Sequence, residues 1–229
     1  PLPEEQATIF HNFVAKSLFA TKRARPDIST AVAFLTTRVK SPDDDDWKKL
    51  VRMIRYLRGT LELALTLAAD STCIPKWWVD GSHAVHPNMR GHTGGCMSLG
   101  CGMVINGSTK QKLNTRSSTE TELVASDDFM PIILWTNYFL EAQGYGTCNS
   151  ILYQDNKSAI LLEKNGRASS SKRTKHINIR FYFITDWIEK RELSVEYCPT
   201  GEMIGDFHTK PLQGNLFVKF RRAIMNLPE

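Results

Sequence analysis

Several features that mark common protein classes are missing from this sequence of 229 residues. No run of about 20 apolar residues occurs, which excludes a membrane-spanning helix, so no membrane partner is expected. The N-terminal sequence PLPEEQATIF has no basic start followed by an apolar core and is not a signal peptide; because it lacks an initiator Met, we expect a fragment of a longer protein. The five cysteines form no CxxC pair, and such an odd, scattered set indicates reduced thiols inside a cell.

Acidic residues are scarce toward the C-terminus. Residues 156–229 carry 13 Lys or Arg against 8 Asp or Glu, which accounts for the whole net charge of +5. Within this part, the segment KNGRASSSKRTKH at 164–176 has five bases and no acid. It is either a solvated loop or a strip that contacts nucleic-acid phosphates, because clustered Lys and Arg displace counterions from such a backbone.

The first 70 residues have mainly the spacing of helices. Apolar residues recur at helical intervals over 4–21 and 27–40. At 41–60, four acids precede an apolar stripe and several bases, which matches the dipole of a helix; a metal site at Asp43–Asp46 is the weaker alternative. Residues 61–68 alternate apolar and polar side chains and predict a strand.

A second region follows a break near Asp70–Pro75. Its patterns predict the order strand-strand-strand-helix-strand-helix-helix-strand-helix, with a long helix at about 118–143 that Pro131 should kink. This order is typical of a mixed α/β layer fold with early hairpins and later crossover connections.

Acidic side chains stand at unusual places in this second region. Asp80 and Asp155 each end a predicted strand, and Asp206 starts a terminal helix. At about 100° per residue, Glu122 faces the buried stripe of the long helix, whereas Glu120 faces its wetter side and suits a helix cap. A carboxylate on a buried stripe is costly unless a positive group pairs with it.

Two neighbouring strands that ended in Asp80 and Asp155 would place these carboxylates side by side, where they need a cation. No Lys or Arg nearby in the sequence supplies a fixed partner. Hard oxygen ligands suit Mg²⁺ or Mn²⁺, and two such ions about 4 Å apart can clamp a phosphate. The alternative is that these acids are only caps and turn formers.

A zinc site is a weaker hypothesis, because the spacings of its residues match no finger pattern. The ligands of such a site would be His83, His86, His92 and Cys96.

Four stretches resemble, in order and spacing, the ribonuclease H domain of copia-type retrotransposon Pol polyproteins. They cover about residues 77–213 and read WWVDGS, SSTETELVAS, LYQDNKSAILLEKNGRASSSKRTKHINIRFYFI and VEYCPTGEMIGDFHTKPL. Within them, TELVA is similar to the retroviral Glu motif, which supports Glu122 over Glu120. Residues 1–70, through TKRARPDISTAVAFLTTRV and WKKLVRMIRYLRGT, resemble the segment that joins the reverse transcriptase to this domain. No YxDD polymerase motif occurs, so the chain is not a complete reverse transcriptase.

The resemblance implies a ribonuclease H-like, five-stranded mixed sheet flanked by helices at 73–229, after a mostly helical, connection-like segment at 1–72. It implies an endonuclease that hydrolyses the RNA strand of RNA/DNA hybrids during reverse transcription, with two Mg²⁺ or Mn²⁺ ions as cofactors. The implied partners are the hybrid and the upstream reverse transcriptase region. The implied location is the cytoplasm, in a virus-like particle, with the nucleus as an alternative.

Residue roles also follow from the resemblance. Asp80 would bridge both ions, Asp206 would hold the ion that activates water, and Glu122 with Asp155 would hold the ion at the leaving oxygen. The basic segment would hold hybrid phosphates. Its contacting residues would be Lys164, Arg167, Lys172, Arg173 and Lys175.

The chain departs from the family pattern near its last Asp. The loop YCPTGEMIG lacks the His that many ribonucleases H carry there. His208 is then a surface residue, an auxiliary stand-in for that His, or a sign of a decaying element; Gly205 stands where Ala is usual. His176 matches the copia pattern and is expected to be structural rather than catalytic, with an auxiliary role as the alternative. An inactive remnant that binds nucleic acid or braces a polymerase is therefore the alternative function, and an integrase or resolvase of the same fold ranks last.

Overall fold

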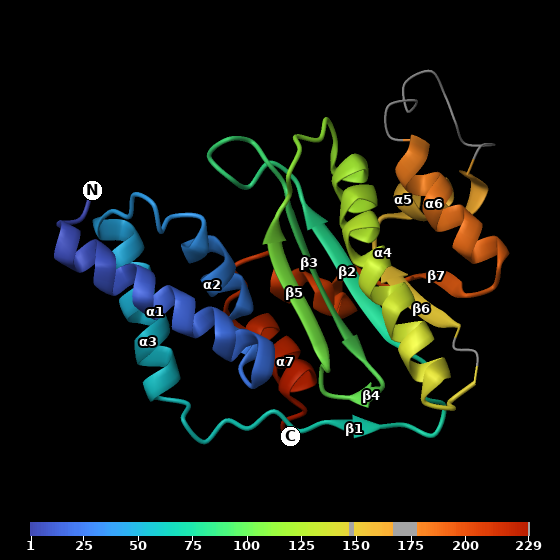
Figure 1. Cartoon of the computed structure of the whole chain (residues 1–229), viewed down its shortest axis with the longest axis horizontal. Helices are drawn as coiled ribbons and strands as arrows, with labels where there is room; N and C mark the ends of the chain where they lie inside the picture. The colour runs from blue at the N-terminus through green and yellow to red at the C-terminus, as the bar shows by residue number, and fades with distance from the viewer. Residues whose placement is uncertain (147–148, 167–177, 229) are drawn as a thin grey trace.

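The centre of the molecule is a five-stranded mixed sheet in the order β5-β3-β2-β6-β7 (Figure 1). The structure is a computed structural model, and it describes residues 1–146, 149–166 and 178–228. β3 pairs antiparallel with β2 and β5, whereas β6 runs parallel to β2 and β7. The predicted α/β class and five-stranded sheet are confirmed. The strands are β2 (Lys76–Ser82), β3 (His92–Ser98), β5 (Ile105–Lys110), β6 (Ser150–Gln154) and β7 (Leu193–Tyr197).

Helices cover both faces of this sheet, and each face has its own apolar core. On one face the core residue Trp77 packs with side chains of α4 and α6, and on the other Trp78 packs beside those of η5 and α7, as expected for alternate residues of one strand. α4 continues through Pro131 as one element. The helices are α4 (Ser118–Ala142), α5 (Lys157–Asn165), α6 (Asn178–Glu189), the short 3-10 helices η4 (Thr200–Glu202) and η5 (Ile204–His208), and α7 (Gly214–Met225).

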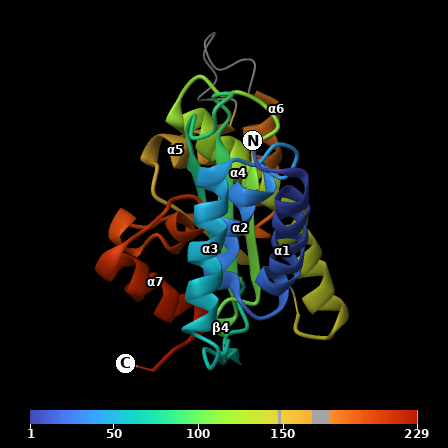
Figure 2. The same ribbon diagram turned by 90° about the vertical axis from the view of Figure 1, so that its left-hand side faces the viewer.

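The N-terminal helices lie beside edge strand β5 and share a separate apolar core (Figure 2). At the start of α3, the Asp43 carboxylate accepts the Asp46 N–H at 2.9 Å, and the Asp46 carboxylate accepts the Asp43 N–H at 3.1 Å. These bonds confirm that the acidic run starts a helix. A division of the chain at residues 72 and 73 stays a prediction. The elements are α1 (Glu4–Arg23), η1 (Pro26–Ile28), α2 (Ser29–Thr36) and α3 (Asp44–Arg58).

The predicted strand at 61–68 is wrong. Leu61 and Leu67 are exposed, and among the described residues only Ala68, at the end of this stretch, pairs with another strand. An alternating pattern forms a strand only where a neighbouring strand exchanges backbone hydrogen bonds with it. At that end, β1 (Ala68–Ala69) pairs with β4 (Gly100–Cys101).

Buried histidines join the N-terminal helices to the sheet. Phe34 of α2 stacks on His86 and His92, with ring centroids 4.8 and 4.7 Å apart. His86 Nε2 lies 3.0 Å from His92 Nδ1, and His92 Nε2 lies 2.8 Å from Ser108 Oγ. The ring nitrogens of His92 are thereby engaged within the interface.

The zinc site that was considered as a weaker hypothesis is not formed within the part of the chain that the structure describes. Cys96 lies in the apolar core against η5 and α7, and Nδ1 of His83 bonds the hydroxyls of Thr115 and Thr121. The four described cysteines are free thiols. None of the described helices is both long enough and apolar enough to cross a membrane.

Buried His92 should make stability depend on pH. Burial, and then the neighbouring His86, lower the pKa of His92 from 6.5 to about 3. Between these values the unfolded chain binds a proton that the folded chain does not, so stability falls as the pH falls. We expect the free energy of unfolding of the wild type, relative to His92→Asn, to drop by about 2 kcal/mol between about pH 8 and pH 5.

Urea denaturation at these two pH values measures the difference. The matched control is His11→Asn on α1, because His11 is exposed. If the His92→Asn and wild-type curves keep a constant separation while the pH falls, burial of a neutral His92 does not contribute to the pH dependence.

Candidate active site

The ends of two parallel strands bring Asp80 and Asp155 together. β2 and β6 pair in parallel with Trp78 opposite Tyr153, so continuing this register by two residues places Asp80 opposite Asp155. Both residues thus reach the same edge of the sheet, where ligand sites of open α/β sheets lie. Asp80 is buried and Asp155 is half-buried.

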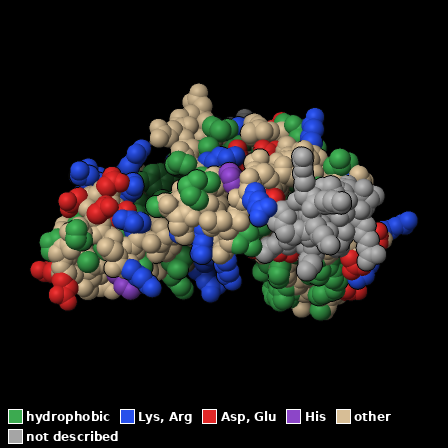
Figure 3. Space-filling model, turned by 90° about the horizontal axis from the view of Figure 1, so that it is seen from above, with side chains coloured by type: hydrophobic (Ala, Val, Ile, Leu, Met, Phe, Trp, Pro, Cys, Tyr) green, Lys and Arg blue, Asp and Glu red, His purple; other side chains and the backbone are tan. Residues whose placement is uncertain are grey.

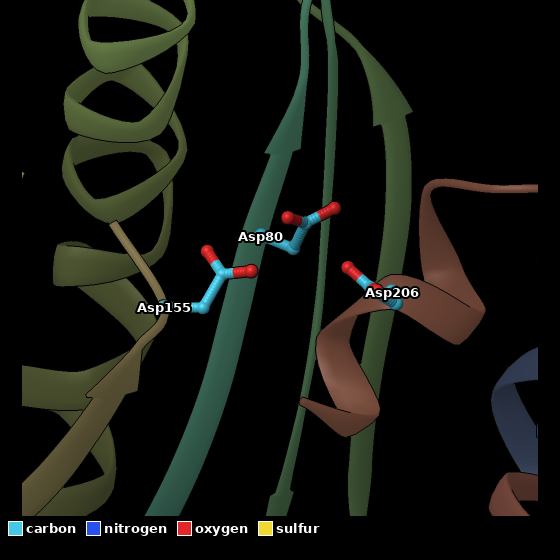
Figure 4. Close-up of side chains that lie close together, drawn as sticks. All are labelled: Asp80, Asp155 and Asp206. Carbon is cyan, nitrogen blue, oxygen red and sulfur yellow. The ribbon is translucent and has the colours of Figure 1, made fainter. Parts of the chain in front are cut away.

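A third carboxylate comes from η5. Asp206 is buried and points toward Asp80 (Figure 4). One carboxylate oxygen from each of Asp80, Asp155 and Asp206 lies within 4.8 Å of the others. We call these three residues the aspartate cluster. Because all its ligand atoms are carboxylate oxygens, the cluster fits a hard divalent cation such as Mg²⁺ or Mn²⁺ rather than a soft metal.

Three glycines allow this close packing. A Cβ at Gly81 would lie 2.6 Å from the carbonyl oxygen of Thr121, so only glycine lets β2 approach α4. Gly94 pairs with Asp80 across the sheet, and a Cβ there would lie 2.6 Å from the backbone of His208 in η5. The unusual Gly205 helps in the same way, since a Cβ would lie 3.1 Å from the Cβ of Asp80.

Glu122 lies beside the cluster, and it is buried, as its helical phase predicted. It lies near the start of α4, and its Oε2 accepts the N–H of Gly81 at 2.9 Å. Glu120 instead accepts the N–H of Arg116 at 2.7 Å, as in the predicted cap. Glu122 is outside the 4.8 Å group formed by the three aspartates.

The electrostatics of the site reflect crowding of like charges. Burial, followed by the carboxylate of Asp80, raises the pKa of Asp206 to about 7. Burial, and then Asp80 and Asp155, also raise the pKa of Glu122 well above its usual value. Carboxylates that resist ionisation side by side form a site that a divalent cation would stabilise.

A lysine that the sequence patterns did not indicate reaches into the cluster. Lys210 Nζ lies 2.5 Å from Asp206 Oδ1 and 3.5 Å from Asp80 Oδ1. The expectation of a missing cationic partner considered only residues near Asp80 and Asp155 in the sequence, whereas Lys210 reaches Asp80 from a distant part of the chain. The i,i+4 spacing of Asp206 and Lys210 in DFHTKP was a signal that could have identified the pair.

Hydroxyl groups complete the surroundings of the cluster. The Thr209 hydroxyl donates to Asp80 Oδ2, and the Thr200 hydroxyl donates to Asp155 Oδ2 at 3.1 Å. The backbone N–H of Asp155 donates to the side chain of Gln154 at 3.0 Å, which holds the turn after β6. These three supporting residues were not predicted.

His208 is fully buried, so its interpretation as a surface residue is wrong. Its Nδ1 lies 2.8 Å from the hydroxyl of Ser29 in α2. Beside it, the Thr30 hydroxyl donates to the carbonyl of Phe207. His208 therefore belongs to the contact between η5 and the N-terminal helices, which favours a structural role over that of an auxiliary stand-in.

Most of the predicted phosphate-binding residues lie outside the described residues. Lys164 is exposed at the end of α5. On the face seen in Figure 3, Lys and Arg side chains lie at several separate places and do not form one patch. Outside the described residues are Arg167, Lys172, Arg173, Lys175 and the auxiliary candidate His176.

Comparisons with known proteins identify relatives. The chain is 30% identical, over 91% of its length, to the retrovirus-related Pol polyprotein from transposon TNT 1-94 of Nicotiana tabacum. It is 32% identical, over 87% of its length, to the corresponding polyprotein from transposon RE2 of Arabidopsis thaliana. The chain spans only 16% and 14% of the lengths of these two relatives. These matches confirm the resemblance that the sequence motifs indicated.

No protein-family model matches the chain. Among solved structures, the N-terminal RNase H domain of a Mycobacterium tuberculosis protein aligns with a TM-score of 0.42 at 10% identity. That alignment covers 60% of this chain and 91% of the other.

The close contact between Gly81 and α4 predicts that a larger residue at position 81 destabilises the fold. Gly81→Ala should lower the free energy of unfolding by roughly 1–3 kcal/mol, because the added methyl group meets a backbone carbonyl that cannot move freely. Gly201→Ala is the matched control, since a Cβ at that exposed position meets nothing within 4 Å; its effect should stay within about 0.5 kcal/mol. Chemical denaturation compares the two, and equal effects would contradict the proposed close packing.

The raised pKa of Glu122 predicts that replacing this residue increases stability in a pH-dependent way. Its folded pKa is raised above 4.5, so the unfolded chain loses its proton first and stability falls as the pH rises from 4.5 through the folded value. Glu122→Gln removes this loss and keeps an acceptor for the Gly81 N–H.

In a chelating buffer, the Glu122→Gln variant should therefore gain stability over the wild type as the pH rises. Thermal unfolding across the pH range measures this gain, with Glu120→Gln on the same helix as the control. A gain that shrinks toward high pH would contradict a raised pKa of Glu122 in the folded chain.

Proposed function

Because the chain belongs to the retrovirus-related Pol polyproteins of retrotransposons, we propose that it is an endonuclease that hydrolyses the RNA strand of RNA/DNA hybrids. The reaction would depend on two Mg²⁺ ions, which Mn²⁺ could replace. It would serve reverse transcription, together with the upstream reverse transcriptase region of the same polyprotein. A cytoplasmic virus-like particle is the proposed place of action.

The convergence of the aspartate cluster carries this proposal. Three elements far apart in the sequence deliver one carboxylate oxygen each to a common point, with ligand atoms within 4.8 Å of one another. Caps and turn formers do not require such convergence, so the alternative interpretation of these acids loses its support. When bound at such a site, two divalent cations activate a water molecule and stabilise the leaving oxygen of a phosphodiester.

The protein's own residues would hold this site in shape. The strand ends fix Asp80 and Asp155, the hydroxyls of Thr209 and Thr200 orient their oxygens, and η5 positions Asp206. Glu122 accepts a hydrogen bond from the backbone N–H of Gly81, the residue that follows Asp80. Hydrogen bonds that fix the carboxylates in this way favour catalysis, because the site needs little reorganisation during the reaction.

The hybrid would be held mainly by its phosphates. The basic segment 164–176 supplies five positive side chains, of which Lys164 is exposed at the end of α5. Binding through phosphates should weaken steeply with salt. Preference for the RNA strand would come from contacts to 2′-hydroxyls across the minor groove.

Cleavage of an end-labelled RNA/DNA hybrid in Mg²⁺ or Mn²⁺ tests the proposal. The wild type should cut only the RNA strand, and Asp155→Asn should lose at least about a hundredfold in rate, as expected when a group that acts at the transition state is removed. Asp186→Asn is the matched control, because Asp186 is exposed on α6 and pairs with Lys190. The same measurements with a DNA duplex report on strand preference.

The result also decides between the enzyme and the inactive remnant. If neither the wild type nor Asp155→Asn cuts, and both bind the hybrid, the chain is a binding module in this form. A fusion to the upstream polymerase region then asks whether that region restores cleavage; a fusion that still does not cut contradicts the proposed enzyme.

A further inference from the structure

Lys210 places an ammonium group inside a cluster of acids. Its Nζ is 2.5 Å from Asp206 Oδ1 and 3.5 Å from Asp80 Oδ1. The two carboxylates are almost completely buried, whereas the lysine side chain is 40% exposed. The ammonium group of a partly exposed side chain therefore contacts two buried carboxylates.

Two other i,i+4 Lys–Asp pairs of the chain lack this environment. The pairs Lys49–Asp45 and Lys190–Asp186 are exposed on both sides. Exposed pairs of this kind contribute little to stability, because water screens them and ordering long side chains costs entropy. Lys210 differs because its partner oxygens belong to carboxylates that repel one another.

Lys210 and the preceding residue act on the same carboxylate. The Thr209 hydroxyl donates to Oδ2 of Asp80, while Lys210 faces Oδ1 of Asp80 and Oδ1 of Asp206. Two consecutive residues thus contact Asp80 and Asp206, and Lys210 is the only ion-pair partner of these two carboxylates within the part of the chain that the structure describes. This arrangement supplies a counter-charge to a site that would otherwise consist only of negative groups.

An ammonium group and a divalent cation that both contacted Asp206 Oδ1 would repel each other at such short distances. A lysine has a flexible four-carbon stem, and the exposure of Lys210 gives it space to withdraw into solvent. We propose that Lys210 is a resident cation of the site, which stabilises the converged carboxylates and is displaced from them by a divalent ion. This inference rests on the proposed metal-dependent function.

The proposal predicts that Lys210 weakens metal binding by competition. Lys210→Met keeps the length of the stem and removes the charge, so divalent ions should bind on the order of tenfold more tightly, which corresponds to about 1.4 kcal/mol. Lys210→Arg keeps the charge and should bind them like the wild type. Lys49→Met is the matched control and should also bind them like the wild type.

Isothermal titration of the 229-residue chain with Mg²⁺ and with Mn²⁺ measures the midpoint for each variant, after circular dichroism has checked the fold. A lower midpoint in Lys210→Met alone supports the proposal. An equal or higher midpoint in Lys210→Met overturns it, as does the absence of metal binding from all variants. If Lys210→Met is unfolded without metal, folding on addition of Mg²⁺ supports the proposal, and failure to fold at saturating Mg²⁺ overturns it.

This readout is independent of cleavage. If the wild type binds Mg²⁺, and Lys210→Met binds it more tightly, but neither cuts the hybrid, the resident cation stands and the proposed nuclease activity fails. If the wild type cuts and Lys210→Met binds the ion no more tightly, the nuclease stands and the resident cation fails.

Discussion

Repulsion between carboxylates at one edge of the sheet is the constraint on which the rest of this structure depends. Asp80, Asp206 and Glu122 are buried, and Asp155 is half-buried beside them. Such groups separate or take up protons unless the surrounding backbone holds them and a cation compensates them. The parallel register of β2 and β6 supplies the rigid frame, and Lys210 supplies a single positive charge.

Close packing is the second requirement, because η5 must lie directly on the sheet for Asp206 to reach Asp80. Gly94 provides the space on β3, and the N-terminal helices hold η5 from outside. Ser29 contacts His208, and Thr30 donates to the carbonyl of Phe207. The N-terminal segment is therefore part of the support of the site, although its own apolar core is separate.

The family relationship and the geometry of the site both support the proposed function. The relatives are much longer polyproteins, so this chain corresponds to only a part of their length. The site itself consists of oxygen ligands around a point where a phosphodiester and divalent cations could meet. We propose that Lys210 holds the carboxylates together before a divalent ion binds. Binding of the ion would then require displacement of the ammonium group but no movement of the carboxylates.

Periodicity along the sequence was sufficient for the elements that pack against a partner along their whole length. The alternation in β7, the phase of Glu122 on α4 and the acidic start of α3 are local properties, and the residue pattern alone determined them. Residues 61–68 have an equally regular pattern, but no strand lies beside most of them, so only Ala68–Ala69 became a strand.

Contacts between distant segments were decided by the tertiary structure. One interpretation of His208 was a surface residue, yet Ser29 of α2, almost 180 positions earlier in the chain, contacts its buried side chain. Lys210 was overlooked because its partnership with Asp80 spans two elements, although its spacing from Asp206 was visible. The sequence by itself determined which carboxylates stand at element ends; only the packing of β2, β6 and η5 decided that they converge, since electrostatic pairing depends on distance in space and not on separation along the chain.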